Sequence, residues 1–418
     1  MPVALTALCF AYGSGWPDVS RLGVTQSVAL HGSLRIDPYA SQTRDRSRYG
    51  GHWYSDKAPG ISFLALPTFE AMRALHVVDR NDEEQGIWHD RGLLTAARLL
   101  TGGLAFVLCV LLVGIGAEEL RPGTGILVAA TFGLGTMALP LAATTHGHLA
   151  AGGLALGAFL TARRDAAFLS GALAALAVVF EYQLAVAAGV VGIFLVARSR
   201  AVRAVALFAL GTVVPLGLLA SYDTLAFGAP QHLSYRYFAG GFGQQHEHFF
   251  GIGLANPHAI ASVLFGHRGL LVFSPVLLLA AAGLVLLWRR GLRAEAAACG
   301  AIAALFILLD AGNWDPLGGL SPGPRYVAPA LPFLALGLCE AFARWPALTG
   351  AFALVSVGGM LYQAGTYGPN FDFSTVWWWL GLPRAVGFAL VLLPCVGALA
   401  LAGQALRANA IRVSEPEG

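Results

Sequence analysis

The sequence predicts an all-α, polytopic helical membrane protein, and three observations lead to this fold class. First, 56% of the 418 residues are hydrophobic and only 12% are charged, whereas charged residues make up about 25% of a typical soluble domain. Second, apolar runs of bilayer-spanning length recur from one end of the chain to the other. Third, arginine-rich junctions separate several of these runs. We therefore expect about twelve transmembrane helices in one domain, residues 1–418.

The apolar runs set the expected helices. The first run has neither a basic segment before it nor a small-residue cleavage site, so it predicts a first spanning helix rather than a signal peptide. Arginines follow several runs, and the positive-inside rule places them, together with both termini, on the cytoplasmic side. The runs cover residues 1–16, 59–76, 93–117, 124–142, 149–162, 166–180, 183–197, 201–226, 270–288, 295–311, 326–343, 347–366 and 385–406.

Two segments test this arrangement. Residues 166–197 form one apolar stretch that is interrupted only around Glu181. Arginines precede and follow this stretch, so it must cross twice, as two runs of about 15 residues each, which leaves Glu181 at the outer surface. Counted back from the arginine junctions, the run 93–117 starts on the outer face, where the loop 17–58 also lies. Residues 59–76, which connect the two, are therefore predicted not to cross. That segment is short and contains Pro67, which suits a re-entrant or surface-lying helix.

The large polar loops then all fall on the outer face, where we expect any chemistry to take place. The net charge of +3 says little about partners, because what matters is the sign of the charge at each place on the surface. Nothing in the charge pattern indicates a nucleic-acid surface. The five cysteines lie in apolar runs without metal-like spacing, which is typical of packing residues. The outer loops are 17–58 (the first outer loop), 77–92, 143–148, 227–268 (the large outer loop), 312–325 and 367–384.

The segment Tyr49–Gly60 (YGGHWYSDKAPG) is polar, aromatic and doubly charged, and it lies beside an apolar run. Asp56 and Lys57 are tolerated at a membrane boundary only where they meet water, each other or a ligand. The segment is consistent with an interfacial loop anchored by Tyr54 and its aromatic neighbours. It is equally consistent with a ligand site that is held close to the membrane surface.

Three further ionisable residues are candidates for a site, and two of them, Asp18 and Arg325, allow two interpretations each. Asp18 is either the N-cap of an amphipathic helix 19–30 or a functional carboxylate at the boundary. Glu181, between two apolar helices, indicates a site because ionisable residues there are costly otherwise. Arg325 enters a helix from a loop, where its guanidinium either binds a phosphate or snorkels to the interface.

Two His-x-His pairs also face outward. They are His146 with His148, and His246 with His248 next to Glu247. Such a pair is a weak signal for a metal site, and it needs ligands from a second loop to hold an ion. Histidines that are satisfied at the membrane interface are the alternative, so a divalent metal ion stays open.

These motifs resemble the GT-C superfamily of integral-membrane glycosyltransferases, specifically the bacterial relatives of protein O-mannosyltransferases and aminoarabinose transferases. The resemblance lies in the first loop, HGSLRIDPYASQTRDRSRYGGHWYSDKAPGISFLALP, which ends in a Lys-Ala-Pro-Gly entry into a helix. The segments THGH, FEYQ, FGHRGLLVFSPVLLL and LSPGPRYVAPALPFLAL support it, in order along almost the whole chain.

The resemblance implies a GT-C-like fold and a membrane glycosyltransferase. Such an enzyme moves a sugar from a polyprenyl-phosphate donor, a membrane lipid, to a glycan, lipid or protein acceptor at the outer face of the bacterial cytoplasmic membrane. By position, Asp18 matches the family's general base, and Asp56 and Lys57 fall in the donor pocket. The chain departs from the family in one respect, because Asp18 stands alone where adjacent acids are common.

The chemistry agrees with such a site. Transfer from a lipid phosphate needs a base for the acceptor hydroxyl and a cation for the departing phosphate. Asp18 or Asp56 could supply the carboxylate, and Lys57, Arg325 or Arg268 the cation. A transporter or flippase for a lipid-linked saccharide is the alternative, but it would carry polar residues through its spans. A non-catalytic membrane assembly protein is a third interpretation.

Overall fold

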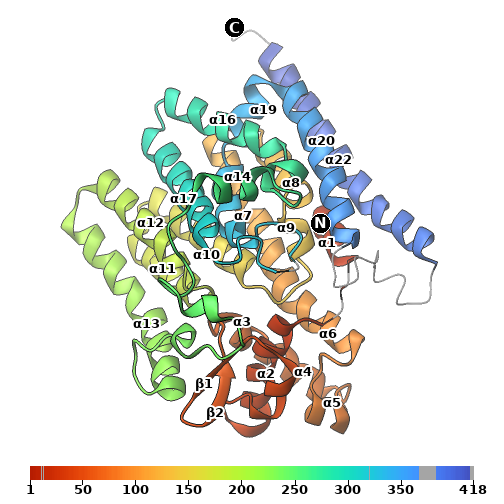
Figure 1. Ribbon diagram of the computed structural model, residues 1–418. Helices are drawn as coiled ribbons and strands as arrows, with labels where there is room; N and C mark the ends of the chain where they lie inside the picture. The colour runs from red at the N-terminus through yellow and green to blue at the C-terminus, as the bar shows by residue number, and fades with distance from the viewer. Residues whose placement is uncertain (11, 13, 320, 367–382, 415–418) are drawn as a thin grey trace.

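The computed structural model describes residues 1–10, 12, 14–319, 321–366 and 383–414. It shows a helical bundle with a smaller lobe at one end (Figure 1). The N-terminal lobe, residues 16–98, has a hydrophobic core of its own that includes Leu22, Phe69 and Trp88. Its elements are α2 (Trp16–His31), the 3-10 helix η1 (Asp37–Gln42), β1 (Arg46–Tyr49), β2 (His52–Ser55), α3 (Gly60–Leu64), α4 (Leu66–Ala74), α5 (Arg80–Gln85) and α6 (Arg91–Arg98).

Helix α2 begins earlier than the sequence predicted. Its N-cap is Gly15, and Pro17 lies in the first turn, where a missing N–H has no cost. Asp18 is therefore not the N-cap but the third helical residue. Its carboxylate reaches back to accept the Gly15 N–H at 2.8 Å, so it still stabilises the positive end of the helix.

The first outer loop contains a β-hairpin that the sequence analysis missed. Strands β1 and β2 pair antiparallel, with Arg46 opposite Ser55 and Tyr49 opposite His52. Gly50 and Gly51 join them with φ of +58° and +85°, which is the left-handed backbone that a tight two-residue hairpin turn requires. The hairpin sets which residues of the loop face one another.

The segment 59–76 does not span, as predicted. It forms two short helices, α3 and α4, and Pro67 lies in the first turn of α4. Both helices pack against α2 within the N-terminal lobe. Figure 1 shows them beside α2 rather than along the bundle.

The bundle contains the remaining helices. From α6 the chain continues through a π-helical turn, η2 (Leu99–Gly103), as one helical segment of 30 residues. The other elements are α1 (Pro2–Leu8), α7 (Leu104–Leu120), α8 (Gly125–Gly135), α9 (Ala138–Leu141), α10 (His148–Arg163), α11 (Ala167–Phe180), α12 (Leu184–Ser199), α13 (Val202–Phe227), η3 (Ser234–Tyr237), η4 (Gly243–His246), α14 (Pro257–Phe265), α15 (Leu270–Phe273), α16 (Val276–Arg289), α17 (Arg293–Gly312), η5 (Arg325–Ala330), α18 (Leu331–Ala335), α19 (Leu338–Arg344), α20 (Pro346–Thr366) and α22 (Arg384–Ser414).

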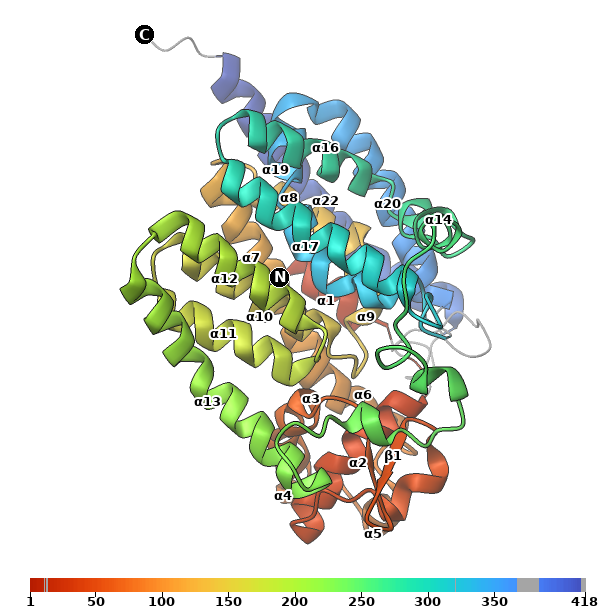
Figure 2. The same ribbon diagram turned by 60° about the vertical axis from the view of Figure 1, so that its left-hand side comes forward.

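The predicted break at Glu181 is confirmed. Helix α11 ends at Phe180 and α12 begins at Leu184, so Glu181 lies in the turn between them. The two helices pack against each other, and α13 covers α11 along one side of the bundle (Figure 2). The turn places Glu181 at the end of the bundle that meets the N-terminal lobe.

Three other apolar runs differ from their prediction. The run 270–288 is broken before Pro275, and the segments on either side are bent by 92°. The run 326–343 begins as the 3-10 helix η5, where Pro329 and Pro332 interrupt regular α-helical hydrogen bonding. It then bends by 51° between Ala335 and Leu338. The first run forms α1, a helix of seven residues that packs against α8 and α22.

The number of crossings stays a prediction. Among the described residues, four helices are long and apolar enough to span a membrane, or up to six if each bent pair is one span. Other apolar helices, such as α11 and α12, have 10–17 residues. The predicted outer loop 367–384 lies almost entirely outside the described residues.

The arginine-rich junctions are joined by ion pairs at the end of the bundle opposite the lobe. Arg163 contacts both Glu119 of α7 and Glu295 of α17. Glu340 of α19 pairs with Arg121 and with Arg290. These contacts gather the junctions on one face, which the positive-inside rule requires.

We predict that the two ends of the bundle lie on opposite sides of the membrane. The five native cysteines are buried, so an introduced cysteine gives a clean signal. Asn81→Cys, on exposed α5 of the lobe, should react with a membrane-impermeant maleimide added outside intact cells. Arg203→Cys, at the exposed start of α13, should react only after the cells are opened. Labelling of both positions from the same side would contradict this topology.

Candidate functional site

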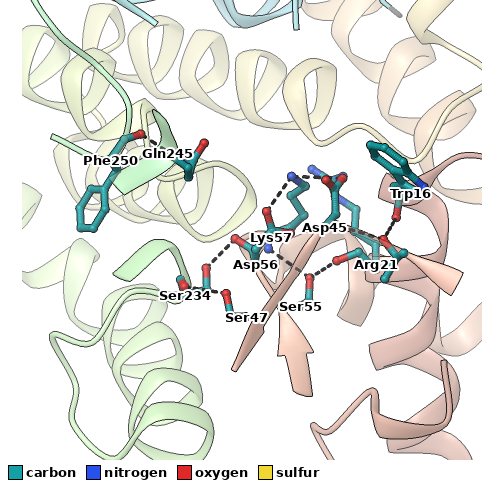
Figure 3. Close-up of polar contacts among 12 residues, drawn as sticks. Trp16, Arg21, Asp45, Ser47, Ser55, Asp56, Lys57, Ser234, Gln245 and Phe250 are labelled. Carbon is teal, nitrogen blue, oxygen red and sulfur yellow. Dashed lines mark hydrogen bonds and ion pairs between the residues drawn. The ribbon is translucent and has the colours of Figure 1, made fainter. Parts of the chain in front are cut away.

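Lys57 lies between two carboxylates where the N-terminal lobe meets the bundle (Figure 3). Its Nζ is 3.2 Å from Asp45 Oδ2 and 2.9 Å from Asp56 Oδ2. The Asp56 side chain is only 3% exposed, whereas those of Asp45 and Lys57 are 14% and 16% exposed. Burial lowers the pKa of Lys57, but the two carboxylates outweigh burial and hold that pKa above its usual value. Lys57 is therefore a fixed positive charge.

Four serine hydroxyls hold the backbone around this cluster in place. The hydroxyl oxygens of Ser20, on α2, and Ser55, on β2, share a hydrogen bond at 2.7 Å. Ser234 Oγ donates to the Asp56 carbonyl at 2.6 Å, and Ser47 Oγ donates to the Ser234 carbonyl at 2.7 Å. The end of the hairpin is thus fixed to α2 on one side and to the loop after α13 on the other (Figure 3).

A buried ion pair joins the lobe to the bundle. Arg21 Nη2 donates to Glu181 Oε1 at 3.0 Å, and both side chains are buried. His148 Nδ1 lies 3.5 Å from the same oxygen. Gly147 makes room for this carboxylate, because a Cβ at that position would lie 2.6 Å from Glu181 Oε1 and 2.8 Å from the Phe180 carbonyl oxygen.

The turn before α10 connects Glu181 to Arg325. Arg325 Nη1 lies 2.8 Å from His146 Nε2, and the guanidinium sits 5.2 Å from the centre of the Tyr326 ring. Burial, and then the charge of Arg325, lower the pKa of His146 well below its usual range. This imidazole is therefore neutral, and its Nε2 accepts from the guanidinium. His146 and His148 stack with ring centres 5.7 Å apart.

Asp18 is buried in an ion pair of its own. Its Oδ1 accepts from Arg98 Nε at 3.1 Å and from Thr145 Oγ1 at 2.8 Å. Its Oδ2 accepts from Arg98 Nη2 and from the Gly15 N–H. A carboxylate has about four acceptor positions, so Asp18 has to release a partner before it can take a proton from an acceptor hydroxyl.

The structure places two predicted residues beside this cluster rather than in it. Tyr54 packs against Phe227 with ring centres 5.3 Å apart, in an aromatic group under the hairpin. Arg268 Nη1 donates to the carbonyls of Gly319 and Ser321, at 3.0 and 2.8 Å. Arg268 therefore fixes the loop that leads to Arg325.

The metal suggested by His246 and His248 stays a prediction without a ligand set. Among the residues that the structure describes, no three His, Cys, Asp or Glu side chains come close enough together to hold a metal ion. His246 instead lies beside the Phe238 ring, with centres 6.1 Å apart.

Three residues of the site were not singled out from the sequence. Arg21 follows Asp18 by one turn of helix, so their shared face was a usable signal. Arg98 lies in a predicted spanning run, where an ionisable residue indicates a partner or a site. Asp45 has no such local signal. The hairpin register brings it opposite Asp56, because the neighbouring pair is Arg46 and Ser55.

Several buried polar atoms around Lys57 have no hydrogen-bond partner in the described part of the chain. They are Nε and Nη1 of Arg21, Oδ1 of Asp56 and Nδ1 of His146. An unsatisfied buried polar group costs about 1–3 kcal/mol, so a cluster of such groups indicates a ligand. With Lys57 and Arg325 at hand, the donors suit an anionic ligand such as a phosphate.

The fold and site define a polytopic membrane protein with a buried, charged cluster at one end of its helical bundle. No family model matches the chain, and no curated protein sequence matches it. Among solved structures, the chain is similar to the crystal structure of ArnT from Cupriavidus metallidurans bound to undecaprenyl phosphate, with a TM-score of 0.50 and 15% sequence identity. The similarity covers 97% of this chain and 73% of the ArnT chain. The similarity is one of fold, and it confirms the predicted all-α, polytopic helical architecture.

We predict that the pair of Asp18 and Arg98 stabilises the fold. Asp18→Asn leaves a buried guanidinium without its counter-charge, which costs about 3–5 kcal/mol and should lower the apparent Tm in detergent by several degrees. Glu84→Gln is a matched control because it breaks the exposed pair with Arg80, which contributes at most about 1 kcal/mol. Equal Tm values for the two variants would contradict a structural role for the Asp18 pair.

Proposed function

We propose that this protein is a membrane glycosyltransferase that moves a sugar from a polyprenyl-phosphate donor to an acceptor at the outer face of the bacterial cytoplasmic membrane. The observation that carries the proposal is that three cations, Lys57 and Arg21 of the lobe and Arg325 of the bundle, lie close enough to the buried His146 for their charges to act on it. The acceptor class is a glycan, lipid or protein of the cell envelope. The fold shared with ArnT supports the same function.

Lys57 and Arg325 are the proposed partners of the donor phosphate. A phosphate needs cations with geometrically fixed donors, and both side chains are held in place by neighbouring residues. Asp45 and Asp56 hold Lys57, and His146 holds Arg325. Arg21 adds two donor atoms that have no other partner within the described residues.

An apolar groove beside α16 and α17 offers a place for the polyprenyl chain. Its volume is about 440 Å³, and its lining is almost entirely aliphatic, including Leu264, Leu270, Leu284 and Leu334. Leu334 belongs to α18, the helix that follows directly after η5. Arg325 begins η5, so one continuous segment leads from the proposed phosphate site to the groove.

The reaction is a displacement at the anomeric carbon of the sugar. A carboxylate takes the proton of the acceptor hydroxyl, and the hydroxyl oxygen forms the new bond to the anomeric carbon. The bond between this carbon and the phosphate oxygen breaks, and its electron pair leaves with the phosphate. Lys57 and Arg325 stabilise the charge that develops there. The products are the glycosylated acceptor and polyprenyl phosphate.

Asp56 is the carboxylate best suited to the role of base. Its Oδ1 has no partner among the described residues, whereas both oxygens of Asp18 are fully engaged. Burial raises the pKa of Asp56 to about 6, against the opposing effect of Lys57, and such a value suits proton transfer near neutral pH. Asp18, the base implied by family resemblance, is the alternative.

The transport interpretation has less support. A translocation path needs polar residues through the middle of the spans. Asp223 and Asp310, two buried acids of α13 and α17, lie near the ends of those helices instead. Translocation of a lipid-linked saccharide without a new glycosidic bond would nevertheless favour a transporter.

We predict that Lys57→Ala and Arg325→Ala each lower kcat/KM for the donor by about 10²–10³-fold, because each removes a partner of the departing phosphate. The assay offers purified protein a panel of polyprenyl-phosphate sugars and measures released polyprenyl phosphate. Arg35→Ala, an exposed cation of the same lobe, is the matched control and should retain activity. Wild-type rates in both site variants would contradict the phosphate role, and no turnover with any donor would contradict the enzyme proposal.

A pH profile identifies the base. A base acts only when deprotonated, so kcat/KM should fall as the pH drops through about 6, the pKa of Asp56. Asp56→Asn should lower the rate by about 10²–10⁴-fold and remove this acidic limb from the residual activity. If Asp18→Asn removes the limb instead, in protein that is still folded, the base is Asp18.

A further inference from the structure

Asp45 differs from Asp56 in how it is held. The two carboxylates face each other across the hairpin, next to the pair of Arg46 and Ser55, and both contact Lys57. A hydroxyl anchors each backbone, since Ser234 Oγ donates to the Asp56 carbonyl and the Asp45 N–H donates to Thr43 Oγ1 at 3.0 Å. The side chains differ, because that of Asp56 is buried. Asp45 precedes β1 at the edge of the cluster and is several times more exposed. Figure 3 shows it on the opposite side of Lys57 from Ser234. Of the two acids, Asp45 therefore has the side chain with more room to move away from Lys57.

The charges around Lys57 oppose an incoming phosphate. One ammonium group faces two carboxylates, so this part of the site carries a formal charge of −1 when both acids are ionised. A phosphate oxygen that approaches Lys57 therefore meets repulsion unless one carboxylate withdraws. The withdrawal of Asp45 would leave Lys57 with one carboxylate and free one of its three donor positions.

We propose that Asp45 is a placeholder for the donor phosphate: it holds Lys57 in the empty site, yields Lys57 to the phosphate, and takes it back to expel the product. The inference rests on the proposed function and adds a positioning residue to the same site. Asp45 acts through Lys57 and takes no part in bond making.

The chemistry of transfer explains why such a residue is useful. The donor is a phosphate diester with one negative charge. When the bond to the sugar breaks, the phosphate keeps the electron pair and becomes a monoester, whose charge at neutral pH is about −1.5 to −2. The product therefore binds Lys57 and Arg325 more tightly than the donor does. A carboxylate on the same chain competes with the product at a high effective concentration and accelerates its release.

Binding of undecaprenyl phosphate, measured with the full chain in lipid nanodiscs, tests the proposal. Asp45→Asn removes the competing charge, so we expect its Kd to be about tenfold lower than that of the wild type. Asp37→Asn is the matched control: it removes one acidic charge from the same lobe at a residue that contacts His52 rather than Lys57. Its Kd should equal that of the wild type.

Kinetics give a second readout, in which tighter binding of the product appears as slower steady-state turnover. With a donor that supports turnover, Asp45→Asn should keep a wild-type rate in a single turnover. Under multiple turnover it should show a burst of about one product per enzyme and then a slower steady rate, because product release has become limiting. If Asp45 merely positions Lys57, the variant would instead bind undecaprenyl phosphate more weakly and slow the single turnover.

The outcomes separate this proposal from the function on which it rests. No binding of undecaprenyl phosphate to the wild type overturns the proposed function. Binding to the wild type with an equal or weaker affinity in Asp45→Asn overturns the placeholder role alone. Asp45→Ser, which removes the charge with a smaller side chain, repeats the measurement if the asparagine variant fails to fold.

Discussion

Two buried residues of α2, one helical turn apart, fix this helix within the lobe and against the bundle. Asp18 pairs with Arg98 of α6, and Arg21 pairs with Glu181 between α11 and α12. Neither charge can be left without its partner at low cost, so α2 has a single favourable position. The same helix carries Ser20, whose hydroxyl holds Ser55. The placement of Lys57 at the end of the hairpin therefore follows from ion pairs that do not include it.

Close backbone approaches make this arrangement possible. Gly102, in the π-helical turn after Arg98, lies so near the Thr144 carbonyl oxygen that a Cβ would come within 2.1 Å of it. This contact positions the neighbouring Thr145, which donates to Asp18. π-Helical turns often occur at functional sites, and here the turn allows the segment after Arg98 to pack against the loop before α10. Gly147 then leaves room for Glu181.

The sequence was sufficient for much of the fold and for part of the site. Charge parity around the arginine junctions predicted the break at Glu181, because hydropathy and the positive-inside rule act on long, uniform segments. The bend before Pro275 was missed, since apolar composition alone does not show where a helix changes direction. Lys57 and Arg325 were expected in one site with Asp18, from their common boundary. The pairing of Asp18 with Arg98 was not expected, because it joins residues that are far apart in the chain and that only tertiary packing brings together.

The missed hairpin shows how one local feature affects the interpretation of a site. A Gly-Gly pair between strand-forming residues is a hairpin signal, and the register that it imposes places Asp45 opposite Asp56. Two acids in such a position repel each other and need a cation between them. The residue after Asp56 is Lys57. A correct interpretation of Gly50 and Gly51 would therefore have identified Asp45 as a member of the site.

The position of η5 relates the charged cluster to the membrane. Arg325 begins this 3-10 helix, and Leu334 of the next helix lines the apolar groove. Pro329 and Pro332 prevent a regular α-helix from starting at Arg325, so the segment leaves the polar cluster as a 3-10 helix and bends only after Ala335. Gly152 of α10 allows η5 to pack closely against α10, because a Cβ there would lie 2.8 Å from the Pro329 carbonyl oxygen. A ligand with a phosphate head and an isoprenoid tail would therefore meet polar and apolar partners on one continuous stretch of chain, from Arg325 to Leu334.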